Sequence, residues 1–188
     1  PGLPAIDFYP REMFPWAAAL EARTDQIRDE LLALLQEDEE RFIPYVQKNL
    51  PQGTAASPWA PLNHSTNWGV YFLHNQGEPV ERNLARCPAT AQALSAVPLV
   101  HIPGRGPSVF FSRLKPGAHI PAHHGATNTR LVAHLPLVVP PNCGLRVGNR
   151  TVEWRPGELV VFDDTLEHEA WNRSDQTRVV LIFDVWNP

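Results

Sequence analysis

The sequence predicts a single, mainly β domain of the jelly-roll type, preceded and flanked by helices. At least seven short runs rich in β-branched and aromatic residues recur after residue 66, separated by Gly, Pro, Asn and Asp. Such a series favours a sandwich or a jelly roll over a parallel α/β sheet. The 188 residues, 43% of them hydrophobic, suffice for one packed domain. We divide the chain into a helical and loop lead-in, residues 1–66, and a jelly-roll core, residues 67–188.

The lead-in begins with a Pro-rich stretch and then predicts a helix, because apolar residues recur at mostly helical spacing between charged neighbours. We expect this stripe to cover one face of the sheet, although a partner-binding helix is the alternative. Residues 49–63 are rich in Pro, Gly, Ser and Ala and are predicted to form a loop. The apolar positions of the helix are Trp16, Leu20, Ile27, Leu31, Leu34 and Leu35.

The predicted strands follow one another through the core. Gly148 and Asn149 stand between two of them and are typical of a tight turn, so these two strands should form a hairpin. A short helix, residues 89–96, interrupts the series. The strand sequences are NWGVYFLH, PSVFFSRL, RLVAHLPLVV, CGLRV, RTVEWR, ELVVFDD and RVVLIFDVW.

Composition argues against several classes of protein. The net charge is -4 and the 16 Lys and Arg are scattered, so we expect no nucleic-acid partner. The longest apolar stretches fall far short of the roughly 20 residues that a membrane helix needs, so no membrane span is expected. Cys87 and Cys143 lack metal-like spacing and are predicted to be free thiols of a reducing compartment. The opening also lacks the pattern of a signal peptide. We therefore expect a cytoplasmic protein.

Histidine is concentrated near the middle of the core and again at His168, in PGELVVFDDTLEHEAWN. This segment combines a Pro-Gly turn, an apolar strand, an acidic turn and then the histidine. It looks like the second metal-binding segment of cupin and double-stranded β-helix proteins, which holds an imidazole at the mouth of a barrel. His168 is therefore the first ligand candidate. Asp163 and Asp164 either orient an imidazole or form the turn.

The second ligand should lie on an earlier strand or strand end, where AHHGATNTRLVAH offers His123 and His124. In the usual oxygenase triad, the residue two positions after the first histidine is Asp or Glu. This chain has Gly125 there, which has no side chain to bind a metal. The sequence therefore predicts a metal site with two protein ligands and with water, substrate or another anion in the third place.

Several motifs in order closely resemble the aspartyl/asparaginyl β-hydroxylase family, whose members have His-x-Gly where relatives have His-x-Asp. They are LKPGAHIPAHHGATNTRLVAHLPLVVP, FDDTLEHEAWN and VVLIFDVWNP, and the opening GLPAIDFYP resembles bacterial members. The resemblance covers about residues 67–188. It implies a double-stranded β-helix that binds iron(II) and uses 2-oxoglutarate and O2 to hydroxylate an unactivated carbon.

By this resemblance, His123 and His168 are the iron ligands and the catalytic residues, and His124 faces the other side of its strand. Arg178 would hold the distal carboxylate of 2-oxoglutarate with help from Ser112, and His134 would belong to the same cosubstrate site. A cation that enters an apolar strand is usually paired with an anion, although a strand-end Arg in water is the alternative reading of Arg178.

The strand RLVAH contributes candidate residues for binding the substrate. A period of two places Arg130, Val132 and His134 on one face, where a cation and a histidine need partners unless the strand is an exposed edge. The resemblance assigns Arg130 to a substrate carboxylate and places Trp68 near the pocket, although aromatic residues in strands are mostly core. Relatives that act on epidermal-growth-factor-like domains have a second Arg at the position of Val132, so their substrate is not transferred to this chain.

We expect the substrate to be an Asp or Asn side chain, free or in a peptide, because Arg130 suits a carboxylate or amide. Two alternatives remain. A halogenase would use the space at Gly125 for chloride at iron, and a non-catalytic cupin-like module would bind anions without a redox metal. Analysis of bound metal and of chlorinated product separates the three.

Overall fold

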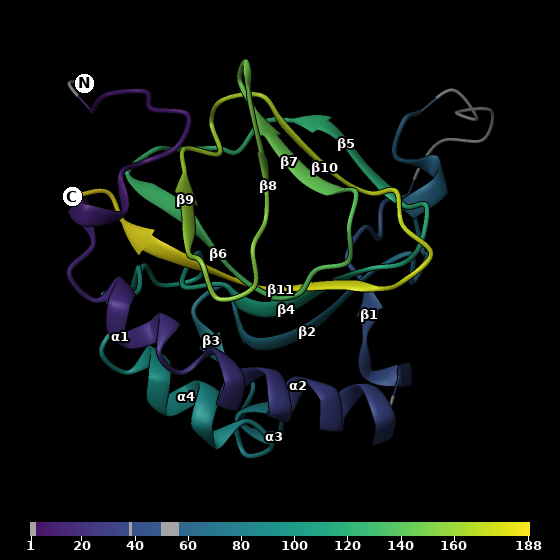
Figure 1. The fold of residues 1–188 in the computed structure, drawn as a ribbon, viewed down its shortest axis with the longest axis horizontal. Helices are drawn as coiled ribbons and strands as arrows, with labels where there is room; N and C mark the ends of the chain where they lie inside the picture. Colours follow the sequence, from purple (N-terminus) through teal and green to yellow (C-terminus); the bar gives the residue numbers. More distant parts are fainter. Residues whose placement is uncertain (1–2, 38, 50–56) are drawn as a thin grey trace.

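The structure, a computed structural model, describes residues 3–37, 39–49 and 57–188. Two antiparallel β-sheets face each other and form a jelly roll (Figure 1). The larger sheet has the order β1-β2-β4-β11-β6-β9, with β3 beside β2, and the smaller has the order β5-β10-β7-β8. The strands are β1 Ile43–Pro44, β2 Trp68–Asn75, β3 Glu78–Pro79, β4 Val109–Leu114, β5 His119–His123, β6 Arg130–Val138, β7 Cys143–Val147, β8 Arg150–Glu153, β9 Val160–Phe162, β10 His168–Asn172 and β11 Arg178–Trp186.

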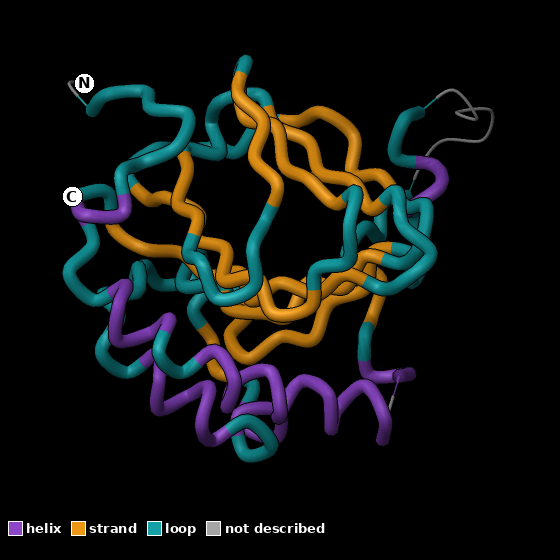
Figure 2. Tube along the Cα trace, in the orientation of Figure 1, coloured by secondary structure: helices purple, strands orange, loops and turns teal. Residues whose placement is uncertain are grey.

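The α-helices gather on the outer face of the larger sheet, on the side away from the smaller sheet (Figure 2). The longest is α2, and the predicted helix of the lead-in is divided into α1 and α2. The α-helices are α1 Ala17–Glu21, α2 Thr24–Glu37, α3 Glu81–Leu84 and α4 Pro88–Leu94, and the short 3-10 helices are Arg11–Met13, Glu39–Arg41 and Ala60–Leu62. No helix among the described residues is long and apolar enough to cross a membrane.

The larger sheet separates two apolar clusters, and β11 contributes to both. Val179, Leu181 and Phe183 pack with the helices on one face. Val180 packs between the two sheets, and Ile182 lies against the same cluster. This alternation follows from the two-residue period of a strand. Arg178 and Asp184 alternate in step with Val180 and Ile182, so their side chains also face the space between the sheets.

The lead-in packs as predicted and also pairs with both edges of the larger sheet. Leu20, Ile27, Leu31 and Leu34 are buried, and Trp16 and Leu35 are packed against the same cluster, so the apolar stripe is core. The Tyr9 amide donates to the Val161 carbonyl at 2.9 Å, and β1 pairs with β2.

All seven predicted strands are present, and β7 and β8 form the predicted hairpin, with Gly148 in the left-handed region at φ 55°. The predicted short helix corresponds to α4. The sequence did not predict β5 and β10 as separate strands, because polar residues interrupt their apolar pattern. Of the predicted loop at 49–63, residues 50–56 lie outside the described part of the chain, and the remainder includes a 3-10 helix.

Candidate active site

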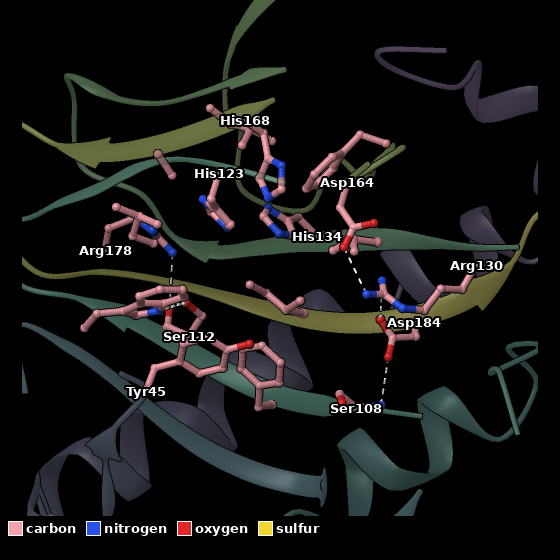
Figure 3. Close-up of a pocket in the computed structure, with 18 of the residues that line it drawn as sticks. Tyr45, Ser108, Ser112, His123, Arg130, His134, Asp164, His168, Arg178 and Asp184 are labelled. Atoms are coloured by element: carbon pink, nitrogen blue, oxygen red, sulfur yellow. Dashed lines mark hydrogen bonds and ion pairs between the residues drawn. The ribbon is translucent and has the colours of Figure 1, made fainter. Parts of the chain in front are cut away.

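A cavity of about 180 Å³ lies between the two sheets. It is lined by every residue that the sequence singled out for the site: Trp68, Ser112, His123, Arg130, His134, His168 and Arg178. In Figure 3, Arg178 and Ser112 lie on one side of the imidazoles and Arg130 lies on the other. A wider hollow of about 630 Å³ shares part of this lining and adds residues such as Lys48 and Trp59. The site thus has an inner chamber and an outer opening.

Two imidazoles face each other in the inner chamber. His123 ends β5 and His168 begins β10, and these two residues are paired across the strands. Their ring centroids are 4.0 Å apart. His123 Nδ1 lies 2.8 Å from the Pro121 carbonyl oxygen and His168 Nδ1 lies 2.9 Å from that of Leu166. Since a carbonyl only accepts, we assign the proton to Nδ1 in both rings, which leaves each Nε2 with a free lone pair.

Burial keeps these imidazoles neutral. It lowers the pKa of His123 and lowers that of His168 to about 4, with the neighbouring His123 as the second cause for His168. A metal binds the neutral form of histidine, so both side chains are ready ligands at neutral pH without first losing a proton. The two backbone carbonyls fix the orientation of the rings, as such acceptors do for histidines that bind metals in other proteins.

The pair could provide two ligands to a metal, the number expected from the glycine at position 125, and metal binding by these residues stays a prediction. Within the described ranges, no group of three or more His, Cys, Asp or Glu side chains could hold a metal ion. The space beside Gly125 is filled by the carboxylate of Asp164, because a Cβ at residue 125 would lie 2.1 Å from Asp164 Oδ2. Two neutral Nε2 donors that face a cavity suit a metal with several open positions, such as non-haem iron(II).

The two aspartates before His168 have different roles. Asp163 forms the turn, since its Oδ1 accepts from the amide and the hydroxyl of Thr165 at 2.9 and 2.6 Å. Asp164 lines the cavity and its Oδ2 accepts from Arg130 at 3.0 Å. Neither carboxylate orients the imidazole pair, because backbone carbonyls accept from both Nδ1 atoms.

Arg178 is a buried cation at the other end of the chamber. Its relative exposure is 1%, and its guanidinium carbon lies 4.7 Å from the ring centre of Trp154. It donates from Nη1 to the Ser112 carbonyl at 3.3 Å, while its Nε has no partner and no carboxylate in the described part of the chain pairs with it. Burial lowers its pKa to about 10, so it is still protonated at neutral pH. A buried charge of this kind requires an anion.

Polar groups beside Arg178 complete this end. His134 is buried and its Nδ1 has no partner, and burial lowers its pKa well below the usual value. Ser112 is fully buried, and its hydroxyl accepts from Trp68 Nε1 at 3.0 Å. The sequence missed Trp154, since nothing in RTVEWR distinguishes its tryptophan from a core residue.

Arg130 is bound within the protein. Its guanidinium donates to Asp164 Oδ2 at 3.0 Å and to Asp184 Oδ1 at 3.2 Å. The strand face predicted for Arg130, Val132 and His134 is confirmed, since all three line the cavity. The role of Arg130 toward a substrate carboxylate stays a prediction, and so does the substrate contact of Trp68.

The fold and the site define a class: a jelly-roll protein whose facing sheets hold a pair of neutral imidazoles and a buried arginine, without a carboxylate partner among the described residues, in one cavity. The particular family follows from sequence comparison. A sequence model described as Aspartyl/Asparaginyl beta-hydroxylase matches residues 21–188, and the chain belongs to this family.

Relatives in this family are named as hydroxylases. The chain is 37% identical to an ornithine lipid ester-linked acyl 2-hydroxylase of Rhizobium tropici, over 96% of this chain and 60% of that protein. It is 33% identical to the human aspartyl/asparaginyl beta-hydroxylase, over 90% of this chain but 21% of that protein. A cupin domain of an XRE family transcriptional regulator from Enterobacter cloacae is similar over 44% of this chain and 83% of that chain, with 13% identity and a TM-score of 0.37. The chain thus spans only part of the length of these hydroxylases.

Proposed function

We propose that this protein is an iron(II)- and 2-oxoglutarate-dependent dioxygenase that hydroxylates an unactivated carbon. One observation carries the proposal: a pair of imidazoles with free Nε2 atoms shares a cavity with a buried arginine that has no carboxylate partner in the described part of the chain. The first feature suits a metal with open positions, and the second suits the far end of a dicarboxylate.

His123 and His168 would hold iron through Nε2. Arg178 would bind the distal carboxylate of 2-oxoglutarate, with Ser112 and His134 beside it. When bound, iron(II) and 2-oxoglutarate supply the means to activate O2 and remove hydrogen from an unactivated carbon, with succinate and CO2 as products.

The contribution of the protein is placement and exclusion of water. Trp154 stacks on the Arg178 guanidinium and limits the directions in which it can donate. Trp68 fixes the Ser112 hydroxyl by hydrogen bonding to its oxygen. Because these groups are buried and already oriented, a carboxylate that binds there would replace its hydrogen bonds to water with hydrogen bonds to preformed donors of the protein.

The substrate would be a small molecule or a peptide that enters through the outer opening. The human relative is named for Asp and Asn, and the Rhizobium relative for an ester-linked acyl chain, so hydroxylation of an Asp or Asn side chain or of a lipid-like chain is within the range of the family. Cys87 and Cys143 are buried free thiols, which supports a function in a reducing compartment such as the bacterial cytoplasm.

Asp164 weighs against the halogenase alternative. Its carboxylate fills the space beside Gly125 and lines the same cavity as the imidazole pair. A chloride placed there would meet a second negative charge, which costs free energy in a buried site.

Anaerobic titration with iron(II) and 2-oxoglutarate tests the proposal. We expect the weak visible charge-transfer band of a chelated keto acid in the wild-type protein. The band should be absent in His168→Ala and kept in His119→Ala, because His119 lies on the same strand as His123 but is exposed and pairs with Glu169. A folded, iron-supplied wild-type protein without the band would favour a binding module instead.

A further inference from the structure

The substrate side of the cavity offers no free cation at Arg130. Asp164 and Asp184 both pair with it, and their side chains are only 9% exposed. Asp184 Oδ2 also accepts from the Ser108 amide at 3.0 Å (Figure 3). With both carboxylates ionised, this group of three has a formal charge of -1. A substrate carboxylate placed against Arg130 would therefore meet two anions for one cation.

The surface next to these ion pairs is apolar. Val132 follows Arg130 on the same strand face, and Phe110 and Ile182 line the same cavity. An aliphatic segment gains free energy by contact with such a wall, whereas a charged group would lose hydration there without a partner. The reacting carbon is therefore best placed on an uncharged chain.

Arg105 is a further cation on the lining of this cavity, and it is an exposed residue. No carboxylate in the described ranges lies within ion-pair distance of it. The loop that carries it is held in place, since the Arg105 amide donates to the Ile102 carbonyl at 3.0 Å and the Ile102 amide donates to the Gly106 carbonyl at 2.9 Å.

The same loop lies against the ion pairs. A Cβ on Gly106 would be 3.9 Å from Asp184 Oδ2, the atom that Ser108 binds. Arg105 is thus attached to a part of the chain fixed beside the substrate side, and it has donors available to an incoming anion.

We propose that Arg105, and not Arg130, binds the anionic group of the substrate. The substrate class that fits is an amphiphile with the reacting carbon on an uncharged aliphatic segment and a carboxylate or phosphate farther along. This inference rests on the proposed function, since it concerns the substrate of the same site.

Three probes built on twelve-carbon chains test it: sodium dodecanoate, dodecyl phosphate and methyl dodecanoate. Their dissociation constants are measured by calorimetry below the micelle concentration, and hydroxylation by a mass increase in the product. The variants are Arg105→Gln and Arg105→Lys, with Arg155→Gln as the matched control, because Arg155 is also exposed but pairs with Glu158 away from the cavity.

Wild-type protein should bind at least one anionic probe more tightly than the ester and hydroxylate its chain. Arg105→Gln should weaken anion binding roughly 10- to 100-fold, the range of one charge-assisted hydrogen bond, and leave ester binding unchanged. Arg105→Lys should recover most of the loss. The anion with the larger effect identifies the group as carboxylate or phosphate.

Equal affinity for the ester and both anions in the wild type would overturn the inference. So would an Arg105→Gln variant that keeps wild-type anion binding, or a protein that forms the charge-transfer band but binds none of the probes. Loss of the band with the calorimetric pattern intact would instead refute the dioxygenase proposal and leave the anion site standing.

Discussion

Gly125 and Asp164 share one small volume. A Cβ on Gly125 would lie 2.1 Å from Asp164 Oδ2, and the Gly125 amide donates to the Asp164 carbonyl at 2.6 Å. The glycine therefore removes a potential ligand and also admits a carboxylate that reaches Arg130. Position 125 and the ion pair between Asp164 and Arg130 are coupled through this contact.

Gly125→Ala should lower the free energy of unfolding by about 1–3 kcal/mol, because the added methyl group forces the Asp164 carboxylate to move. The effect should shrink when Asp164 is also changed to Ala, since the clash then disappears. Urea unfolding of the two single variants and the double variant measures the coupling. Additive effects would contradict the contact.

Arg178→Gln should raise the dissociation constant for 2-oxoglutarate roughly 10- to 100-fold, because a buried charge-assisted hydrogen-bond donor is lost. Titration of the charge-transfer band reports this directly. Arg173→Gln is the matched control, since Arg173 also lies over a tryptophan, at 4.9 Å from Trp171, but outside the cavity lining. Unchanged affinity in Arg178→Gln would remove the residue from the cosubstrate site.

Trp154→Phe should keep most of the affinity for 2-oxoglutarate, and Trp154→Leu should lose it several-fold. A phenyl ring can still stack on Arg178, whereas an aliphatic side chain loses a cation–π contact that contributes about 0.5–2 kcal/mol. The measurement is cosubstrate affinity at saturating iron. Equal losses in both variants would mean that Trp154 acts only by filling space.

The iron-free protein should become less stable as the pH falls below 6.5. Burial lowers the pKa of His134 well below 6.5 and that of His168 to about 4, so the unfolded chain takes up protons that the folded chain does not. These contributions are complete above the unfolded pKa and are lost as the pH falls toward the folded pKa.

Melting temperatures measured as the pH is lowered from 6.5 check this loss of stability. His134→Gln should show a shallower pH dependence than wild type, because one buried imidazole is gone, and comparison of the two proteins cancels the contribution of the acidic residues. His119→Gln is the control, since that side chain is 52% exposed. An unchanged slope in His134→Gln would contradict the burial argument.

The sequence predicted the larger strands because their alternation is strong. It placed Arg130, Val132 and His134 on one face of β6, and all three line the cavity. It did not separate β5 and β10, where histidines that face the cavity replace the apolar residues on which the pattern depends. At these positions a residue suited to the site replaces a residue that would mark a strand. The histidines were recognised by their motif alone.

Pairings between distant residues could not be predicted. Arg130 meets Asp184 only because β6 and β11 are neighbours in the sheet, and Trp154 reaches Arg178 across the space between the sheets. Arg105 was overlooked because a surface loop has no periodicity that would point it toward a cavity. Contacts of this kind depend on which strands are neighbours in the fold, and the local pattern of residues along the sequence does not specify that order.

The hydrogen bonds from His123 and His168 to Pro121 and Leu166 have a consequence for iron supply. Each ring is held by a carbonyl only two residues earlier, so its orientation is set by local backbone and not by a bound ion. If the pair holds iron as proposed, loss of the metal would leave both imidazoles in place and reloading would require no refolding. In a cell whose iron level varies, the proposed activity would then follow the available metal reversibly, without synthesis of new protein.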